Sequence, residues 1–306
     1  MNASQTIIPG KDLAIHVLGL TKSYGRVRAL CGIELEVKRG EIFGFLGPNG
    51  AGKTTTIRCL LDMIRPDGGK ASLLGLEPQA EPVAVQALSG YLPGEMQFFD
   101  NFTVERQLRF FHAMRGGRVD WNYVRQLAER LNLDMKPQIK NLSKGNKQKV
   151  GVIQALMHRP ELLLLDEPTS GLDPLMQQEV LTLLCEANAA GATVFFSSHI
   201  MSEVESVADR VAIIRAGEIA EVAETESLTH RSLNRLTVRF KTPVETADLG
   251  RLPGVEILSR PDDSSVTLQV QGDMEKLIQA LGCLPIQDLE TERPSLEEIF
   301  LTYYKK

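Results

Sequence analysis

The fold of this 306-residue chain is decided by Gly47-Pro48-Asn49-Gly50-Ala51-Gly52-Lys53-Thr54-Thr55. This stretch fits the pattern G-x-x-x-x-G-K-[ST], whose glycines let backbone N–H groups turn toward phosphate oxygens. The apolar residues 42–46 before it predict a short buried strand, and residues 54–63 after it carry apolar side chains at helical spacing. Strand, loop and helix therefore follow in the order of a nucleoside triphosphate site. We expect Lys53 to contact the outer phosphates, the helix start to add its dipole, and Thr54 to bind Mg²⁺.

A chance match and a dinucleotide loop are the two alternatives to this interpretation. At ordinary residue frequencies a chain of this length meets the pattern by accident roughly once in a hundred. The dinucleotide alternative is weaker, because no G-x-G-x-x-G is present and Lys53-Thr54 has no role on a pyrophosphate bridge.

Composition narrows the class of protein. The chain has 43% apolar and 24% charged residues, as ordinary globular proteins do, and its length allows about two domains. Its net charge of −5 gives no basic field for a nucleic-acid partner. The four cysteines are scattered along the chain, which predicts reduced thiols. No secretory signal and no apolar stretch long enough to cross a bilayer is visible. We therefore expect a cytoplasmic protein without nucleic acid.

Hydrophobic patterning predicts an α/β core followed by a smaller α+β domain. Expected strands, partly antiparallel at first and then parallel, are residues 14–18, 33–37, 42–46, 71–74, 90–92, 162–166, 193–197 and 211–215. Between residues 103 and 159 the pattern is helical only, with helices expected over 103–114, 121–131 and 144–158. After residue 225, strands at 236–240, 255–258, 265–270 and 286–289 with helices at 245–252 and 273–281 would give the β-α-β-β-α-β order of ferredoxin-like sandwiches, and a last helix is expected over 295–304.

Two strand ends carry polar residues suited to phosphate chemistry. Asp166 and Glu167 follow four leucines, at the sheet edge where ligands of open α/β sheets bind. Asp166 suits the hold on magnesium and Glu167 can accept the proton of an attacking water. An acid pair after a strand is often only a helix N-cap, but the phosphate loop favours the catalytic interpretation. His199 follows the strand at 193–197 in the same way and can donate a hydrogen bond near the terminal phosphate.

The order of the remaining motifs leads to a family. Ser143 is well placed as the N-cap of the helix over 144–158, and the strand ending at Asp166 follows some twenty residues later. With Pro168-Thr169-Ser170-Gly171-Leu172-Asp173 after it, the chain resembles the nucleotide-binding subunits of ATP-binding cassette (ABC) transporters over about residues 13–224.

The resemblance implies a role for each motif. The stretch 47–55 matches the family's Walker A loop, 162–166 its Walker B strand, Glu167 its catalytic base and His199 its switch histidine. Tyr24 matches the aromatic residue on which adenine stacks, although it could also be an ordinary surface tyrosine. The family's signature sequence is matched by Leu142, Ser143, Lys144, Gly145 and Asn146, and its D-loop by Ser170, Gly171, Leu172 and Asp173.

Two motifs depart from the family pattern. The signature is Leu-Ser-Lys-Gly-Asn where Leu-Ser-Gly-Gly-Gln is commonest, though Ser143 and Gly145 are kept. In the Q-loop, Gly94-Glu95 stands where the family has glutamine, so Glu95 or Gln97 would have to supply the link to magnesium.

The resemblance implies ATP and Mg²⁺ as cofactors and a dimer that closes around two ATP. It implies a separate membrane permease, six-helix by comparison with export-type cassettes, that would hold the chain peripherally on the inner face of the membrane. Phe98-Phe99 is a candidate permease contact or, equally, part of the packed helical core. Multidrug or antibiotic export is favoured over import; a soluble, non-transport ABC ATPase remains the alternative.

The domains expected are an N-terminal extension (1–12), an ATPase domain (13–224) with a helical subdomain at about 95–160, and an accessory domain (225–306).

Overall fold

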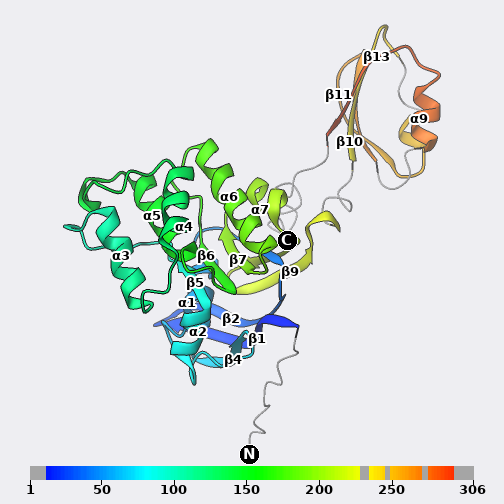
Figure 1. Cartoon of the computed structure of the whole chain (residues 1–306). Coiled ribbons are helices and arrows are strands. Elements are labelled where there is room, and N and C mark those ends of the chain that lie inside the picture. The colour runs from blue at the N-terminus through cyan, green and yellow to red at the C-terminus, as the bar shows by residue number, and fades with distance from the viewer. Residues whose placement is uncertain (1–11, 228–233, 245–248, 271–274, 293–306) are drawn as a thin grey trace, which may run out of the picture. The chain divides into compact units, whose positions relative to one another are not determined.

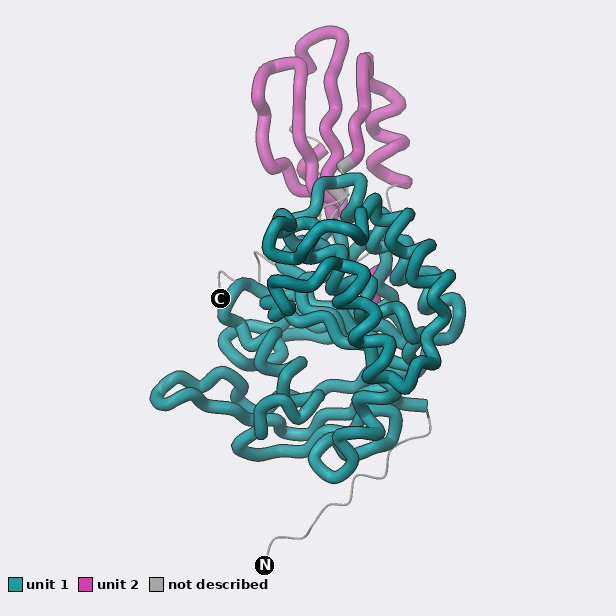
Figure 2. Tube along the Cα trace, turned by 60° about the vertical axis from the view of Figure 1, so that its left-hand side comes forward, with its two compact units in different colours: residues 1–223 teal, residues 224–306 magenta. Residues whose placement is uncertain are grey.

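The computed structural model describes residues 12–227, 234–244, 249–270 and 275–292. The chain divides into two compact units, residues 1–223 and 224–306, coloured separately in Figure 2. Each unit has its own hydrophobic core and is described by itself.

The centre of unit 1 is a six-stranded sheet (Figure 1). Its order is β5-β6-β7-β3-β8-β9, formed by Ser89–Leu92, Leu162–Asp166, Thr193–Ser198, Ile42–Leu46, Arg210–Arg215 and Glu218–Glu224. The pairs β5–β6, β6–β7, β7–β3 and β3–β8 are parallel, and every residue of β3, β6 and β7 is buried. Strands buried on both faces read as continuous apolar runs, which explains why these strands were visible in the sequence.

The register of this sheet aligns three strand ends. Leu46 of β3 pairs with Ser198 of β7, and Asp166 of β6 pairs with Ser197. The loop after β3, the acid pair after β6 and the histidine after β7 therefore emerge side by side at one edge of the sheet.

A second, antiparallel sheet has the order β2-β1-β4 and is formed by Val27–Lys38, Leu13–Tyr24 and Gly68–Leu73. Its buried residues share one core with the parallel sheet and with α1 (Lys53–Leu60), as Leu20, Leu30, Phe45 and Ile57 do. The antiparallel part expected near the start of the chain is confirmed.

The helices expected between residues 103 and 158 are present. They are α3 (Val104–Met114), α4 (Trp121–Arg130) and α5 (Lys144–Leu156), with the 3-10 turn η1 (Ile139–Asn141) between the last two. Thr103, Asp120 and Ser143 cap them by accepting a backbone N–H within the first turn. Patterning along the chain did not predict α2 (Pro82–Leu88), α6 (Pro174–Ala189), α7 (Met201–Val207) or β9. None of the described helices is long and apolar enough to span a membrane.

Unit 2 is a four-stranded antiparallel sheet with the order β11-β12-β10-β13. The elements follow as β10 (Asn234–Phe240), η2 (Leu249–Arg251), β11 (Val255–Asp262), β12 (Ser265–Val270), α9 (Glu275–Leu281) and β13 (Ile286–Glu292). This is the strand order of a β-α-β-β-α-β sandwich, with η2 in the described part of the first crossover. Residues 245–248 of the expected helix at 245–252, and the whole helix expected over 295–304, lie outside the described residues.

Candidate functional site

The glycine-rich loop curls around its own lysine. Lys53 Nζ donates hydrogen bonds to the carbonyl oxygens of Gly47 at 2.6 Å and Pro48 at 3.2 Å, and the side chain is buried. Gly52 has φ +116, and a Cβ there would lie 2.8 Å from the Ala29 carbonyl, so only glycine fits. Burial lowers the pKa of the Lys53 amine, and the Glu167 and Asp166 carboxylates oppose that effect. A charged amine on the concave side of a loop is suited to a bound polyphosphate.

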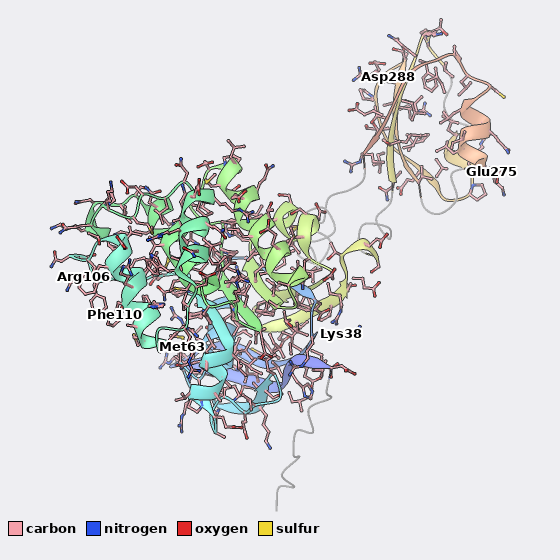
Figure 3. The ribbon with its side chains drawn as sticks, in the orientation of Figure 1. Lys38, Met63, Arg106, Phe110, Glu275 and Asp288 are labelled. Atoms are coloured by element: carbon pink, nitrogen blue, oxygen red, sulfur yellow. The ribbon has the colours of Figure 1, made fainter. Side chains whose placement is uncertain are left out.

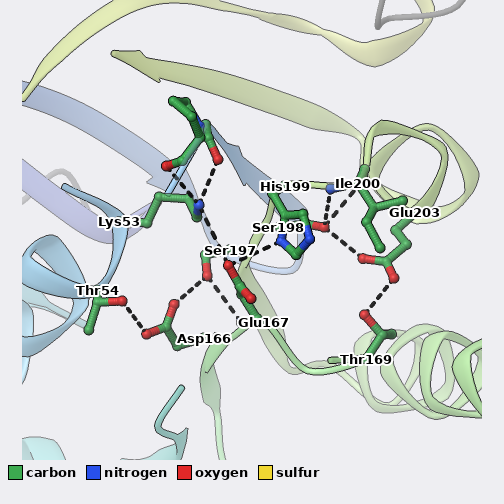
Figure 4. A network of polar contacts seen from close by, with 12 residues as sticks. Lys53, Thr54, Asp166, Glu167, Thr169, Ser197, Ser198, His199, Ile200 and Glu203 are labelled. Atoms are coloured by element: carbon green, nitrogen blue, oxygen red, sulfur yellow. Dashed lines mark hydrogen bonds and ion pairs between the residues drawn. The ribbon is translucent and has the colours of Figure 1, made fainter. Parts of the chain in front are cut away.

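Asp166 joins the loop's helix to the neighbouring strand. Its Oδ2 accepts Thr54 Oγ1 at 2.6 Å and its Oδ1 accepts Ser197 Oγ at 2.5 Å, and the residue is only 1% exposed (Figure 4). A hydroxyl and a carboxylate oxygen in contact form the hard donor set that Mg²⁺ prefers, with its remaining positions left to water and phosphate. The residues present therefore fit magnesium.

The Q-loop approaches Thr54 and Asp166 with the backbone of Gly94, which has no side chain. A Cβ on Gly94 would lie 2.9 Å from Asp166 Oδ2, the oxygen that accepts the Thr54 hydroxyl. Glu95, the expected replacement for the family's glutamine, is exposed. Position 94 is therefore a place where the backbone itself packs against the acid.

Glu167 has an unusual backbone and two polar neighbours. Its φ is +51, which is uncommon outside glycine and concentrates at functional sites. Its Oε1 lies 3.2 Å from His199 Nδ1 and 3.7 Å from Lys53 Nζ, as the dashed lines in Figure 4 mark. The carboxylate is 25% exposed. A water molecule can therefore reach a carboxylate that lies between the Lys53 amine and the His199 imidazole.

Glu203 holds the segments around this site and was missed in the sequence. Its Oε1 accepts Thr169 Oγ1 at 2.5 Å and its Oε2 accepts Ser198 Oγ at 2.6 Å, with the residue 6% exposed (Figure 4). Thr169 precedes the D-loop and Ser198 precedes His199, so one buried carboxylate joins both segments. A glutamate in the first turn of α7 carries no local pattern that could have identified it.

The signature and D-loop residues form a neighbouring cluster. Ser143 caps α5 as expected, accepting the N–H of Asn146 at 3.2 Å, and both Ser143 and Lys144 are exposed. A Cβ on Gly145 would lie 2.8 Å from the Gly171 carbonyl, so the helix tip packs against the D-loop. Asp173 caps α6 by accepting the N–H of Met176 at 3.1 Å. The exposed helix start leaves its N–H groups open to an anion.

Tyr24 lies at the end of β1, on the antiparallel sheet. It is 49% exposed, and Lys22 Nζ stands 5.9 Å from the centre of its ring. Lys22 is in turn fixed by Asp67 Oδ1 at 2.9 Å, and Asp67 Oδ2 accepts the Ser23 N–H at 2.6 Å. The aromatic ring is therefore accessible on an anchored strand end.

Phe98-Phe99 leads into an exposed aromatic cluster at α3. Phe99 lies 4.9 Å from Phe102 and 5.3 Å from Phe110, centre to centre, and is half exposed. Arg106 lies over the ring of Phe102 at 4.0 Å; Figure 3 labels Arg106 and Phe110 on this helix. The cluster is thus packed within itself and also partly open to solvent, which is compatible with both interpretations of Phe98-Phe99.

Comparisons with known proteins find similarity in two regions of the chain, one within unit 1 and one within unit 2. The model of the family described as "ABC transporter" matches residues 30–170, and that of the "ATP-binding protein DrrA1-3-like, C-terminal domain" matches 229–304. The linearmycin resistance ATP-binding protein LnrL of Bacillus subtilis is 31% identical over 92% of this chain and 95% of its own. The bacitracin transport ATP-binding protein BcrA of Bacillus licheniformis is 37% identical over 74% of each. A solved ATP-binding subunit of an ABC transporter is 29% identical with a TM-score of 0.65, covering 70% of this chain and 91% of that one.

Proposed function

The chain belongs to the ABC transporter family as an ATP-binding subunit, and we propose that its ATPase cycle drives export through a separate membrane permease. The resemblance inferred from the sequence and the predicted P-loop ABC fold are confirmed. ATP is the nucleotide that this family binds and hydrolyses. The roles of individual residues, the metal and the partner are the parts we infer.

One observation carries the assignment of roles. Glu167 Oε1 lies within 4 Å of both Lys53 Nζ and His199 Nδ1. Glu167 and His199 directly follow β6 and β7, and Lys53 begins α1 after the loop that follows β3. That arrangement supports Glu167 as the base, Lys53 as the cation on the outer phosphates and His199 as the donor that orients the base or the γ-phosphate.

The proposed reaction is in-line hydrolysis. Glu167 takes a proton from a water molecule that attacks the γ-phosphorus, and ADP leaves with the bridging oxygen. Lys53 and the loop N–H groups stabilise charge on the phosphate oxygens, so positioning and electrostatics supply most of the acceleration. Thr54 and Asp166 would hold Mg²⁺, which neutralises further phosphate charge when bound, and the exposed Glu95 remains a candidate for contact through water.

The second half of the site would come from another copy. The signature residues 143–146 form the start of α5, with Ser143 and Lys144 exposed and Gly145 and Asn146 half-buried. This helix start is suited to the γ-phosphate of a nucleotide held by the 47–55 loop of a partner. The D-loop residues 170–173 pack against this tip and would lie along the same interface. Tyr24 would stack on adenine. ATP would therefore join two cassettes.

The permease would dock on the aromatic cluster of Phe99, Phe102 and Phe110, next to the Q-loop. Exposed aromatic side chains backed by Arg106 provide an anchor of the kind common in protein interfaces. LnrL and BcrA are named for linearmycin resistance and bacitracin transport, which supports export of an antibiotic-like compound through a permease of about six helices. Docking would hold the chain on the cytoplasmic face of the membrane.

The test is the Glu167→Gln variant of the full chain. We expect ATP binding to persist, turnover to fall at least 100-fold, and light scattering at saturating MgATP to report a dimer, because ATP is bound and not cleaved. Lys53→Ala is the contrasting variant and should lose nucleotide binding itself. Normal turnover in Glu167→Gln, or monomers at saturating ATP with and without the permease, would contradict the proposal.

A further inference from the structure

We propose that Gln148 is a positioning residue that couples the helix tip at Ser143 to the backbone of Glu167, and so links the two ATP sites of a dimer. This inference rests on the proposed function, because it takes Glu167 as the base and the Ser143 tip as the group that meets the partner's nucleotide. Gln148 has no role in the motifs identified from the sequence.

Gln148 extends from α5 to the segment that follows the acid pair. Its Nε2 donates to the carbonyl oxygens of Glu167 at 2.9 Å and Pro168 at 3.0 Å, and the residue is only 3% exposed. Both N–H groups of the amide are thus used on two successive carbonyls, in a place that water does not reach.

The backbone that Gln148 holds needs support. Glu167 has φ +51, a left-handed conformation that is strained for a residue with a Cβ. Ser197 fixes the other end of this residue, since the Glu167 N–H lies 3.2 Å from its carbonyl oxygen and 3.1 Å from its Oγ. The Glu167 carbonyl also accepts the Ser170 N–H at 3.1 Å, the first bond of the turn into the D-loop. Glu167 is thus fixed by β7 on one side and by α5 and the D-loop on the other.

The same helix carries the tip that would meet the partner's nucleotide. Gln148 lies five residues after Ser143, a rise of about 7.5 Å along α5. A helix is stiff over this distance, so a shift of the tip moves the amide and with it the two carbonyls. Nucleotide bound at one site would therefore set the position of the base at the other.

Gln107 provides a matched control for a purely structural role. It is also a buried glutamine of the helical region, 1% exposed on α3, and its Oε1 accepts the Phe99 N–H at 3.3 Å. Replacing either glutamine by methionine keeps the volume and removes the polar groups, so a general loss of packing would affect both variants alike.

The experiment compares Gln148→Met and Gln107→Met in the full chain, by phosphate release against ATP concentration, ATP binding and thermal unfolding. We expect Gln148→Met to lower kcat at least tenfold, to leave KM for ATP within twofold and to reduce the Hill coefficient toward one. Gln107→Met should leave kcat, KM for ATP and the Hill coefficient within twofold of the wild-type values. The double variant Gln148→Met/Glu167→Gln should turn over no more slowly than Glu167→Gln alone, because both changes act on one group.

Several results would overturn the inference. One is an unchanged kcat and Hill coefficient in Gln148→Met, and another is an equal loss in Gln107→Met. Should Gln148→Met fail to bind ATP or to unfold cooperatively, the same assays are run on Gln148→Glu. This side chain keeps the length but turns carboxylate oxygens toward the two carbonyls, so we expect the same fall in kcat. Wild-type turnover in Glu167→Gln would instead refute the proposed base, whereas an active Gln148→Met beside an inactive Glu167→Gln refutes only the coupling.

Discussion

The two units of this chain place their polar side chains differently. In unit 1, Asp166, Ser197, Ser198 and Glu203 are buried and hydrogen-bonded around the ends of parallel strands. In the described part of unit 2, strand β10 alternates, with Leu236, Val238 and Phe240 buried and Arg239 exposed. The first pattern holds side chains in fixed positions, whereas the second only separates a core from water.

This difference follows from the type of sheet. A parallel sheet covered on both faces leaves its strand ends as the place where polar groups can gather, whereas an antiparallel sheet covered on one face directs every second residue to solvent. Substitutions near the strand ends of unit 1 should therefore change ATP turnover strongly, and core substitutions in unit 2 should change stability alone. Three variants test this comparison.

Gly94→Gln should have the largest effect. It restores the glutamine of the family pattern, yet the new Cβ would lie 2.9 Å from Asp166 Oδ2 and must displace either the acid or the loop. We expect turnover of MgATP to fall about 100-fold, equivalent to about 2.7 kcal/mol of transition-state stabilisation. Asp100→Gln, an exposed change in the same segment, is the control for phosphate-release assays. A gain of activity in Gly94→Gln would show that a side chain is accommodated there.

Glu203→Met should have a smaller effect, about tenfold on kcat. It removes both acceptors and leaves the Thr169 hydroxyl without its buried acceptor, at a cost of about 1–3 kcal/mol for an unsatisfied group. The Ser198 hydroxyl can still donate to the Ile200 carbonyl at 3.2 Å, so its loss is smaller. Glu203→Gln should recover most of the activity, because an amide accepts from one hydroxyl and donates to the other. Phosphate release and thermal unfolding are measured for both variants. Equal kcat values of the methionine and glutamine variants would argue against a positioning role.

Val238→Ala in unit 2 should change turnover least, within twofold. Val238 is fully buried in the core of unit 2, and its truncation should lower the free energy of unfolding of that unit by about 2 kcal/mol. Calorimetry together with ATPase assays on one preparation checks this. A parallel loss of turnover would indicate that the two units are energetically coupled and would weaken the comparison.

Much of the fold was predictable because the relevant signals are local. The strands β3, β6 and β7 are uninterrupted apolar runs, and Ser143 is a recognisable cap, so their positions could be read to within a residue or two. The amphipathic strand β9 and the short helices α2 and α7 were not predicted. Their stability comes from packing against the sheets, which short sequence windows do not contain.

The sequence by itself determined the phosphate loop, the acid pair and the order of the motifs, because each depends on residues that are neighbours in the chain and on backbone preferences of glycine. The tertiary structure alone decided which side chains meet. Thr54 contacts Asp166 from 112 positions away, Gln148 reaches the carbonyl of Glu167 and Glu203 joins Thr169 to Ser198. Such contacts depend on the register of the sheet and on the packing of α5 and α7 against it, and no periodicity along the chain encodes them.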